Sequence, residues 1–303
     1  MTLKVFEIFS GYGGASFGLK KARIDFECIG ISEIDKYATQ VYNLNHPNVK
    51  NYGDCTKIDP NELPDFDLLT GGFPCQDVSL AGKKDLSRGR TNLYKEILRI
   101  IEVKKPKYLL LENVKGLLYI GKERKLIDII VSDLKKRGYG VIWKVLNSKD
   151  YGTPQNRERV WFVCKFGGWE FNEFQFPNPI RLEKKLLDLT DEIVEDKYYI
   201  TDKQYFRYLK RSDRRNKPIQ KRTNPKISTC LTTKSPKNSP ADSIIIKDSK
   251  GIRTLTPTEC FRLMGLNEIN LGNLSDTQKY HLSGNGWDVN VVSKIFKQMF
   301  RNI

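Results

Sequence analysis

The stretch Phe66-Asp67-Leu68-Leu69-Thr70-Gly71-Gly72-Phe73-Pro74-Cys75-Gln76 predicts a buried strand that ends in a loop carrying a thiol. A short apolar run closed by two glycines is typical of a strand in an open α/β sheet, and such sheets hold their chemistry at the carboxyl ends of their strands. Cys75 can therefore be a nucleophile. Taken alone, a cysteine is about three times more often a small buried apolar residue.

Strand-like and helix-like segments alternate on both sides of this stretch. Extended patterns cover residues 3–9, 28–32, 66–70, 108–111, 141–146 and 160–164, and helical patterns cover residues 15–22, 37–43, 93–103, 126–134 and 289–300. This alternation predicts an α/β fold with a doubly wound, mostly parallel sheet. From about residue 167 to residue 257 the periodicity is weak, and we expect a second, smaller domain there.

Composition narrows the class of protein. The chain has 303 residues, 39% of them hydrophobic, which is enough for a substantial core and about two domains. No apolar run approaches the roughly 20 residues of a membrane span, and Glu7 stands where a signal peptide would be apolar. We therefore expect a cytoplasmic protein with no membrane partner.

The supply of cysteine and histidine restricts the chemistry. Six scattered cysteines without a CxxC pair predict free thiols and no metal site. Histidine occurs only at His46 and His281, so proton transfer is expected from carboxylates, lysine, tyrosine or water.

The net charge of +16 is unevenly distributed. Residues 201–240 hold twelve Lys or Arg against two Asp, a local charge of +10. Such a field attracts a polyanion, with nucleic acid as the first candidate and an anionic membrane as the second. A solvated or partly disordered segment is the alternative.

A glycine-rich turn, Ser10-Gly11-Tyr12-Gly13-Gly14, lies between the first strand pattern and the first helix pattern. Its backbone can approach a ligand, although a tight structural turn explains such glycines about as often. Glu33 closes the second strand pattern, where a carboxylate can accept hydrogen bonds from ribose hydroxyls. Because the turn is GxGG and not GxGxxG, we expect a cofactor without pyrophosphate, such as S-adenosylmethionine.

Further candidates follow later strand patterns. Glu112 comes after an apolar run, where a carboxyl either caps the next helix or serves a site. Because parallel strands end at one edge, Glu33, Cys75 and Glu112 should lie along it. Arg157 and Arg159 would face one side of an extended chain and could hold a phosphate or a base oxygen. For either arginine alone, a surface position is the alternative.

Over essentially its full length the chain resembles the DNA (cytosine-5)-methyltransferases of the bacterial and phage restriction–modification type. The motifs that carry the resemblance occur in that family's order. They are FSGYGG from Phe9, SEIDKYA from Ser32, GD at Gly53, GGFPCQ from Gly71, ENV from Glu112, YGTPQNRER from Tyr151, RTLTPTEC from Arg253, RLMG from Arg262 and GN at Gly284.

The resemblance implies a catalytic set. Cys75 would add to carbon 6 of cytosine, Glu112 would hold and protonate ring nitrogen 3, and Arg159 would contact the base oxygen. Arg157 and Gln155 would shape the pocket. Addition of the thiolate activates carbon 5 toward a methyl sulfonium, and the target base must be flipped out of the duplex.

The resemblance also implies binding residues. The cofactor, S-adenosylmethionine with S-adenosylhomocysteine as product, would contact Phe9, Gly11, Gly13, Glu33, Ile34, Asp54, Cys55, Pro74, Leu93 and Asn285. DNA would contact a basic loop over residues 79–91 that closes on it and the basic region beyond residue 201. These contacts would be Ser79, Lys83, Lys84, Arg88, Arg90, Arg214, Arg215, Lys221, Arg222 and Lys234.

Three segments are expected to divide the work. Residues 1–187 would form the catalytic domain, residues 188–280 the target-recognition domain, and residues 281–303 a C-terminal helix returning to the catalytic domain. The chain departs from the family pattern where Gly286-Trp287 replaces the usual Ser-Val, and where Cys230-Leu231 replaces a Thr-Leu pair.

We therefore expect an enzyme that transfers a methyl group from S-adenosylmethionine to carbon 5 of cytosine within a short sequence of double-stranded DNA. We expect a monomer, with a cognate restriction endonuclease acting on the same site as a candidate partner. The alternatives are an RNA cytosine methyltransferase of the same architecture, a silent homologue that only binds DNA, and a Rossmann oxidoreductase.

Overall fold

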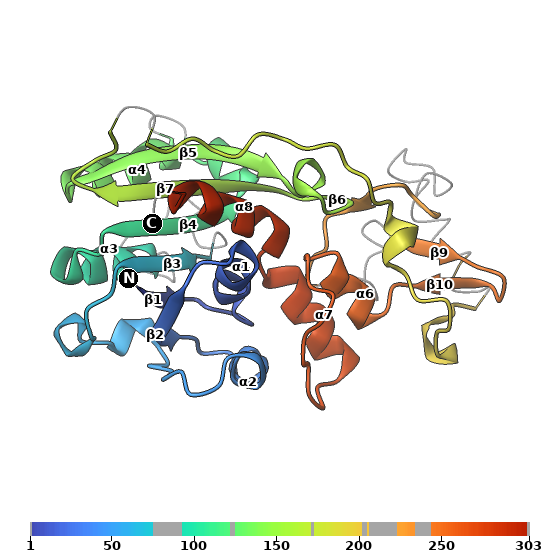
Figure 1. Ribbon diagram of the computed structural model, residues 1–303. Coiled ribbons are helices and arrows are strands. Elements are labelled where there is room, and N and C mark those ends of the chain that lie inside the picture. Colours follow the sequence, from blue (N-terminus) through green and yellow to red (C-terminus); the bar gives the residue numbers. More distant parts are fainter. Residues whose placement is uncertain are drawn as a thin grey trace. The chain divides into compact units, whose positions relative to one another are not determined.

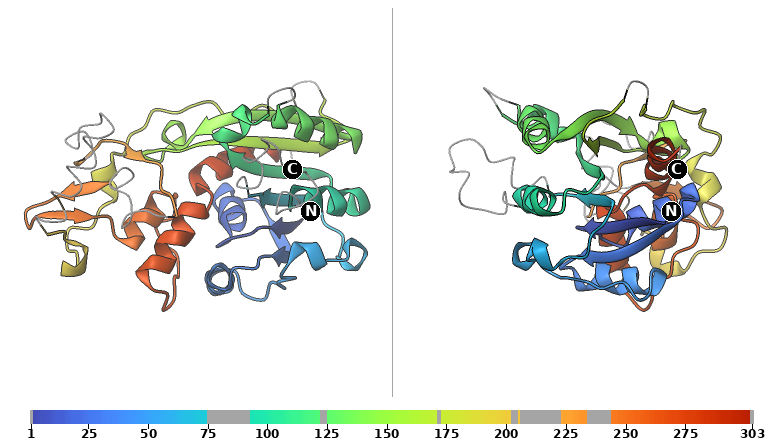
Figure 2. Two further views of the ribbon diagram at one scale, coloured as in Figure 1. Left: turned by 180° about the vertical axis from the view of Figure 1, so that it is seen from behind. Right: turned by 60° about the vertical axis from the view of Figure 1, so that its left-hand side comes forward.

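The computed structural model describes residues 2–74, 93–121, 125–170, 173–201, 205, 223–233 and 244–301. The chain divides into two compact units (Figures 1 and 2). The first comprises Met1–Leu146, Glu158–Asn178 and Val292–Ile303, and the second comprises Asn147–Arg157 and Pro179–Val291. The expected division of labour among residues 1–187, 188–280 and 281–303 is a functional one and stays a prediction.

A six-stranded sheet organises the first unit, with strand order β2-β1-β3-β4-β7-β5 (Figure 1). Its strands are β1 (Leu3–Ile8), β2 (Phe26–Ser32), β3 (Leu68–Gly72), β4 (Tyr108–Val114), β5 (Tyr139–Asn147) and β7 (Glu158–Phe166). The pairs β1–β2, β1–β3 and β3–β4 are parallel, whereas β7 is antiparallel to β4. The predicted α/β fold with a mostly parallel sheet is confirmed.

Helices cover both faces of this sheet (Figure 2). They are α1 (Gly14–Ala22), α2 (Lys36–Asn45), α3 (Leu93–Lys104), α4 (Leu126–Lys136) and the part of α8 (Val289–Met299) that belongs to this unit. On one face, α3 and α4 bury side chains such as Ile97, Ile100 and Ile130 in the main hydrophobic core. Asp35 caps the N-terminus of α2, and its carboxylate accepts hydrogen bonds from two amides of the first turn of the helix.

Two strands differ from the sequence patterns. Strand β4 continues past Leu111 to Val114, so Glu112 lies inside the strand and is not a helix cap. Strand β7 is antiparallel because residues 148–157, which connect it to β5, contain only a 3-10 turn at Ser148–Tyr151 and the short strand β6 (Gln155–Asn156). A parallel connection needs a crossover of a dozen or more residues, usually a helix.

The second unit is built from short elements, which explains its weak sequence periodicity. It holds β8 (Ser228–Thr229), β9 (Ile245–Lys247), β10 (Ile252–Thr254), α6 (Pro257–Arg262) and α7 (Asp276–Asn285). Strands β9 and β10 form an antiparallel pair, and β8 pairs with β6. Buried Arg253 ties this unit together through ion pairs of 2.9 Å to Glu259 and 3.0 Å to Asp248.

Further 3-10 turns connect these elements in both units. They are η1 (Cys55–Lys57), η2 (Pro60–Glu62), η4 (Lys115–Tyr119), η6 (Leu186–Leu189) and η7 (Asp196–Tyr198). Across the described ranges, no helix combines the length and the apolar character that crossing a membrane would require.

The packing of α1 on α8 yields a stability prediction. A Cβ atom at Gly18 would lie 2.4 Å from Val292 Cγ1 and 3.3 Å from Phe296 Cε2. Gly18→Ala should lower the free energy of unfolding by about 1–2 kcal/mol, because overpacking outweighs the gain in helix propensity. The measurement is denaturant unfolding of the purified protein.

Gly116→Ala is the matched control, because the nearest atom to its added Cβ is Val114 Cγ2 at 3.7 Å, an ordinary contact. It should change stability by less than about 0.5 kcal/mol. A Gly18→Ala protein as stable as the control would contradict this packing.

Candidate active site

The predicted site residues of the first unit gather at one edge of the sheet. Strand register places Ile8 beside both Ser32 and Gly71, and Gly72 beside Glu112. Because these strands are parallel, the glycine turn after β1, Glu33 after β2 and Pro74 after β3 follow the same edge on which Glu112 lies. The expected grouping thus holds for every member that the structure describes.

The glycine turn has an unusual backbone that its sequence permits. Phe9, Gly11 and Gly13 have positive φ angles of 56°, 55° and 89°. At Gly13 a Cβ atom would lie 2.8 Å from the His46 ring, so this position requires glycine, whereas the space beside Gly11 is open. Within the described structure the buried Ser10 hydroxyl has no hydrogen-bond partner.

Glu33 connects the glycine turn at residues 10–14 to the turn after β2 at residues 33–35. Its carboxylate accepts hydrogen bonds from the amides of Gly11 and Asp35, both at 2.8 Å. Burial raises the pKa of Glu33 above its ordinary value. The next residue, Ile34, is 78% exposed, so an apolar surface lies directly beside this carboxylate.

Asp54 and Cys55 form the third turn of this edge. The Asp54 carboxylate accepts hydrogen bonds from the Thr56 amide at 3.0 Å and hydroxyl at 2.8 Å, and these bonds hold the pKa of Asp54 below its ordinary value. Cys55 is buried, and Arg99 donates to its carbonyl at 2.8 Å. Burial raises the pKa of the Cys55 thiol to about 12, so it is a protonated core residue at neutral pH.

Glu112 and Arg159 form an ion pair of 2.9 Å between Oε1 and Nε. They come from neighbouring strands, since Arg159 on β7 lies beside Val114, two residues beyond Glu112 on β4. Their side chains are 12% and 16% exposed, so the pair is enclosed but reachable from solvent.

Asn113 fixes the end of β3 next to this pair. Its side chain is buried and donates to the carbonyl of Phe73 at 3.0 Å. Phe73 stands two residues before Cys75. The buried amide therefore anchors the chain immediately ahead of the predicted nucleophile.

The predicted residues Gln155, Arg157 and Asn285 belong to the second unit. Arg157 and Arg159 do not share one side of a strand, contrary to expectation, because β7 begins at Glu158. Arg157 is buried and donates to the carbonyls of Leu231, Gly284 and Gly286 at 3.1, 3.2 and 2.7 Å.

Gln155 makes the same kind of contact. Its side chain accepts from the Leu231 amide at 2.9 Å and donates to the Leu263 carbonyl at 2.5 Å. Asn285, the last residue of α7, lies between the two glycine carbonyls that Arg157 holds. Gln155 and Arg157 thus organise the backbone of the second unit.

The remaining predicted residues are of two kinds. Leu93 begins α3, and Pro74 is exposed at the end of the described segment. Cys75 and all predicted DNA contacts lie outside the described residues: Ser79, Lys83, Lys84, Arg88, Arg90, Arg214, Arg215, Lys221, Arg222 and Lys234. Their roles stay predictions.

Sequence reasoning missed Glu7 as a structural residue. This carboxyl is 1% exposed and accepts hydrogen bonds from Ser16 and Tyr42. An acid between two apolar residues of a strand, Phe6 and Ile8, was the available signal. Glu7 lies in β1, the strand that leads into the glycine turn.

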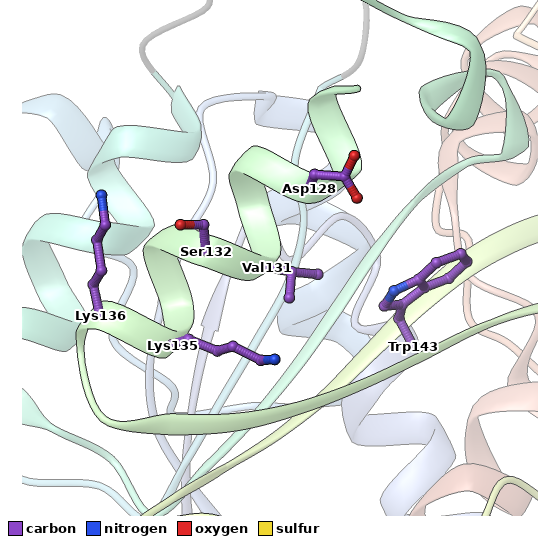
Figure 3. A pocket seen from close by; sticks show the side chains of 6 residues that line it. All are labelled: Asp128, Val131, Ser132, Lys135, Lys136 and Trp143. Carbon is purple, nitrogen blue, oxygen red and sulfur yellow. The ribbon is translucent and has the colours of Figure 1, made fainter. Parts of the chain in front are cut away.

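A hollow lies apart from this edge. An open hollow of about 520 Å³ is lined by α4 and β5, with Trp143 across from Asp128, Val131, Ser132, Lys135 and Lys136 (Figure 3). Neither element carries a predicted site residue.

Among the described residues, no cluster of three or more His, Cys, Asp or Glu side chains could hold a metal ion.

Comparison with known proteins gives a consistent result. The family profile described as C-5 cytosine-specific DNA methylase matches residues 3–301. Type II methyltransferase M.NlaX of Neisseria lactamica is 36% identical over 304 residues, covering 98% of this chain and 96% of that protein. Type II methyltransferase M.Bsp6I of Bacillus sp. (strain RFL6) is 32% identical, covering 99% of each chain.

Solved structures agree on the fold. The S. pombe Dnmt2 methyltransferase has a TM-score of 0.83 at 22% identity, covering 99% of this chain and 100% of that chain. The Entamoeba histolytica methyltransferase EhMeth has a TM-score of 0.82 at 19% identity, covering 100% and 99%. At these identities the likeness concerns the fold alone.

The burial of the described cysteines predicts their reactivity. Cys55, Cys164 and Cys260 are buried, and burial raises the pKa of each thiol. Because the thiolate is the reactive form, they should react with iodoacetamide at least about 10²-fold more slowly in the folded than in the urea-unfolded protein. Peptide mapping by mass spectrometry measures each rate.

The urea-unfolded protein is the control, in which all six cysteines should react at similar rates. Rapid labelling of Cys164 or Cys260 in the folded protein would contradict the described core. If Cys75 is the nucleophile, it should be among the first cysteines labelled in the folded protein.

Proposed function

Because the chain belongs to the C-5 cytosine-specific DNA methylase family, we propose that the edge of its sheet divides into a cofactor site and a cytosine site. The protein is a DNA (cytosine-5)-methyltransferase, similar to type II restriction–modification enzymes, and it methylates carbon 5 of cytosine. The observation that carries the division of the site is the register that sets Gly72, three residues before Cys75, beside Glu112.

The three turns at this edge, at residues 10–14, 33–35 and 54–56, fit a nucleoside cofactor. The open space beside Gly11 admits a ligand close to the backbone, and the buried Ser10 hydroxyl, unpartnered in the described structure, offers a hydrogen bond. Each Glu33 oxygen accepts one amide and keeps a further lone pair for a ribose hydroxyl. Exposed Ile34 offers an apolar surface for a flat base.

We assign S-adenosylmethionine to this site; when bound, it supplies an electrophilic methyl group on a sulfonium. The residues of the first unit that would hold it are Phe9, Gly11, Gly13, Glu33, Ile34, Asp54, Cys55, Pro74 and Leu93. The expected contact of Asn285, which belongs to the second unit, stays a prediction. Cys55 contributes through its backbone and shape, since burial keeps its thiol protonated by raising the pKa to about 12.

Cytosine would lie against Glu112 and Arg159. The Sγ of Cys75 forms a bond to carbon 6 while Glu112 delivers a proton to ring nitrogen 3, and Arg159 holds the base oxygen. Carbon 5 would then accept the methyl group that the sulfonium supplies. Loss of the carbon 5 proton to water, return of the nitrogen 3 proton to Glu112 and departure of Cys75 as a thiolate would restore the ring. The ion pair of 2.9 Å supports the placement of Glu112 and Arg159 in one site.

In this scheme Gln155 and Arg157 act by holding the backbone of the second unit. Their hydrogen bonds go to the backbone at Leu231, Leu263, Gly284 and Gly286. We propose that residues 188–280 read a short sequence of double-stranded DNA, with the +10 charge of residues 201–240 attracting the phosphates.

The cellular setting is proposed on indirect grounds. A single chain carries every proposed site residue, which supports a monomer, and a DNA substrate in a bacterial or phage setting supports the cytoplasm. The type II names of the relatives support a cognate restriction endonuclease acting on the same sequence.

Cys75→Ala tests the nucleophile. Methyl transfer should fall by at least about 10³-fold, because no second thiol can replace the covalent step. Affinity for DNA, measured by band shift, should change less than about threefold, since the substitution leaves the proposed phosphate contacts in place. Incorporation of labelled methyl groups into plasmid DNA measures the transfer.

Cys164→Ala, a cysteine substitution in the core of β7, is the control and should retain most of the activity at 25 °C. Substantial transfer by the Cys75→Ala protein would refute the nucleophile. Loss of DNA binding together with activity would show a folding defect instead.

Specificity is tested by bisulfite sequencing of DNA from cells expressing the chain. Cytosines should resist conversion within one short sequence on both strands, because base contacts in the groove discriminate by about 1–3 kcal/mol each. Cells expressing the Cys75→Ala protein provide the background. Protection scattered over unrelated sequences would contradict specific recognition, and methylation confined to RNA would contradict the DNA substrate.

A further inference from the structure

We propose that Glu7 is a positioning residue for the enzyme. Its buried carboxyl holds in place the glycine turn at residues 10–14 and the turn at residues 33–35, which form the core of the cofactor site. This inference rests on the cofactor site proposed above. Glu7 is 1% exposed in a strand whose other inward positions are apolar. A buried carboxyl is costly, so its retention calls for a role that apolar packing would not fill.

The contacts of Glu7 reach three neighbouring elements. Its Oε1 atom accepts a hydrogen bond from the Ser16 hydroxyl of α1, one of 3.1 Å from the Tyr42 hydroxyl of α2, and one of 3.9 Å from the Cys28 thiol of β2. These neighbours also contact one another, with the Tyr42 hydroxyl oxygen lying 3.2 Å from the Cys28 sulfur and 3.3 Å from the Ser16 hydroxyl oxygen. One carboxyl oxygen is thus the centre of a four-residue cluster.

The positions of these residues in the chain explain the bracing. The glycine turn lies between Glu7 and Ser16, and the turn with Glu33 and Ile34 lies between Cys28 and Tyr42. The cluster therefore links the chain segments that lead into and out of both turns. Above it, the 2.8 Å bond from the Gly11 amide to Glu33 joins the same two turns.

The rear of the glycine turn rests on the same cluster. A Cβ atom at Gly13 would lie 3.0 Å from Tyr42 and 2.8 Å from His46, so the turn touches both rings. Those rings are themselves in contact, with centroids 4.9 Å apart. A displacement of Tyr42 would therefore pass directly to the turn.

The cluster can change charge near neutral pH. Burial raises the pKa of Glu7 to about 7 and that of Cys28 to about 12, and raises that of Tyr42 further. His46, beyond Tyr42, stays neutral because burial lowers its pKa to about 3. From β3 the register neighbour of Glu7 is Thr70, which does not titrate.

The charge of Glu7 sets the strength of the hydrogen bonds that its Oε1 atom accepts. While the carboxyl is ionised, the three hydrogen bonds to Oε1 are charge-assisted, whereas protonation makes the same bonds neutral and therefore weaker. The pKa is raised, so the protonated form prevails below about pH 7 and the ionised form above it. The turns should therefore be held more firmly at pH 8 than at pH 6.

Glu7→Gln tests the proposal, because glutamine resembles the protonated carboxyl at every pH. At pH 8 it should raise the KM for S-adenosylmethionine about fivefold, with the KM for DNA and kcat changing less than about twofold. At pH 6 the wild-type KM should approach that of the variant, whose own KM should not change between the two pH values. Tyr42→Phe should give a similar rise at pH 8, and the double variant should show no further rise.

Glu259→Gln is the matched control, because Glu259 is equally buried but lies in the second unit on Arg253. It should lower the melting temperature and leave the KM for S-adenosylmethionine unchanged. An unchanged KM in a folded Glu7→Gln protein, or an equal rise in Glu259→Gln, would overturn the proposal. If Glu7→Gln does not fold, Tyr42→Phe decides by the same criteria.

Calorimetric titration of the wild-type protein with S-adenosylmethionine separates the two hypotheses. Failure of the wild-type protein to bind would refute the cofactor site itself. Binding by the wild-type protein, with an unaltered affinity in Glu7→Gln at pH 8, would refute the brace alone.

Discussion

The arrangement of the active edge depends on one constraint, the parallel register of β3 with β4 that pairs Gly72 with Glu112. Because parallel strands end together, the chain leaving β3 toward Cys75 begins beside the carboxyl that would handle the cytosine ring. The antiparallel return of β7 then places Arg159 against Glu112. Glycine at position 71 permits the close approach of β3 to β1 at the same edge, since a Cβ atom there would lie 2.7 Å from Ile8 Cγ2.

Much of this architecture could be predicted from the sequence, because hydrophobic periodicity locates strands and helices well. The patterns over residues 3–9, 93–103 and 126–134 all correspond to observed elements. Periodicity does not reveal where pairing continues past a charged residue. Glu112 therefore seemed to follow its strand, although the structure shows it inside β4. The direction of β7 was equally hidden, because it follows from the length of a connection and not from the strand itself.

Side-chain roles were harder to predict than elements. Glu33 and Glu112 lie where the motifs indicate, because each motif couples a residue type to the end of a strand. Arg157 differs because its partners are carbonyls more than 70 residues away in the chain, which no local pattern encodes. Glu7 was missed for a related reason: its hydrogen-bond donors come from three other elements that only the fold assembles.

The contacts of Arg157 have a consequence for how such enzymes diverge. Arg157 holds main-chain carbonyls at Leu231, Gly284 and Gly286, and Gly284 packs against the backbone of Thr232. Anchors of this kind are indifferent to the side chains of the segment they hold. Side chains of the proposed recognition region other than Gly284 and the buried Arg253–Glu259 pair can therefore change without loosening these hydrogen bonds. A lineage could acquire a new DNA target by altering that segment while its framework stays constant.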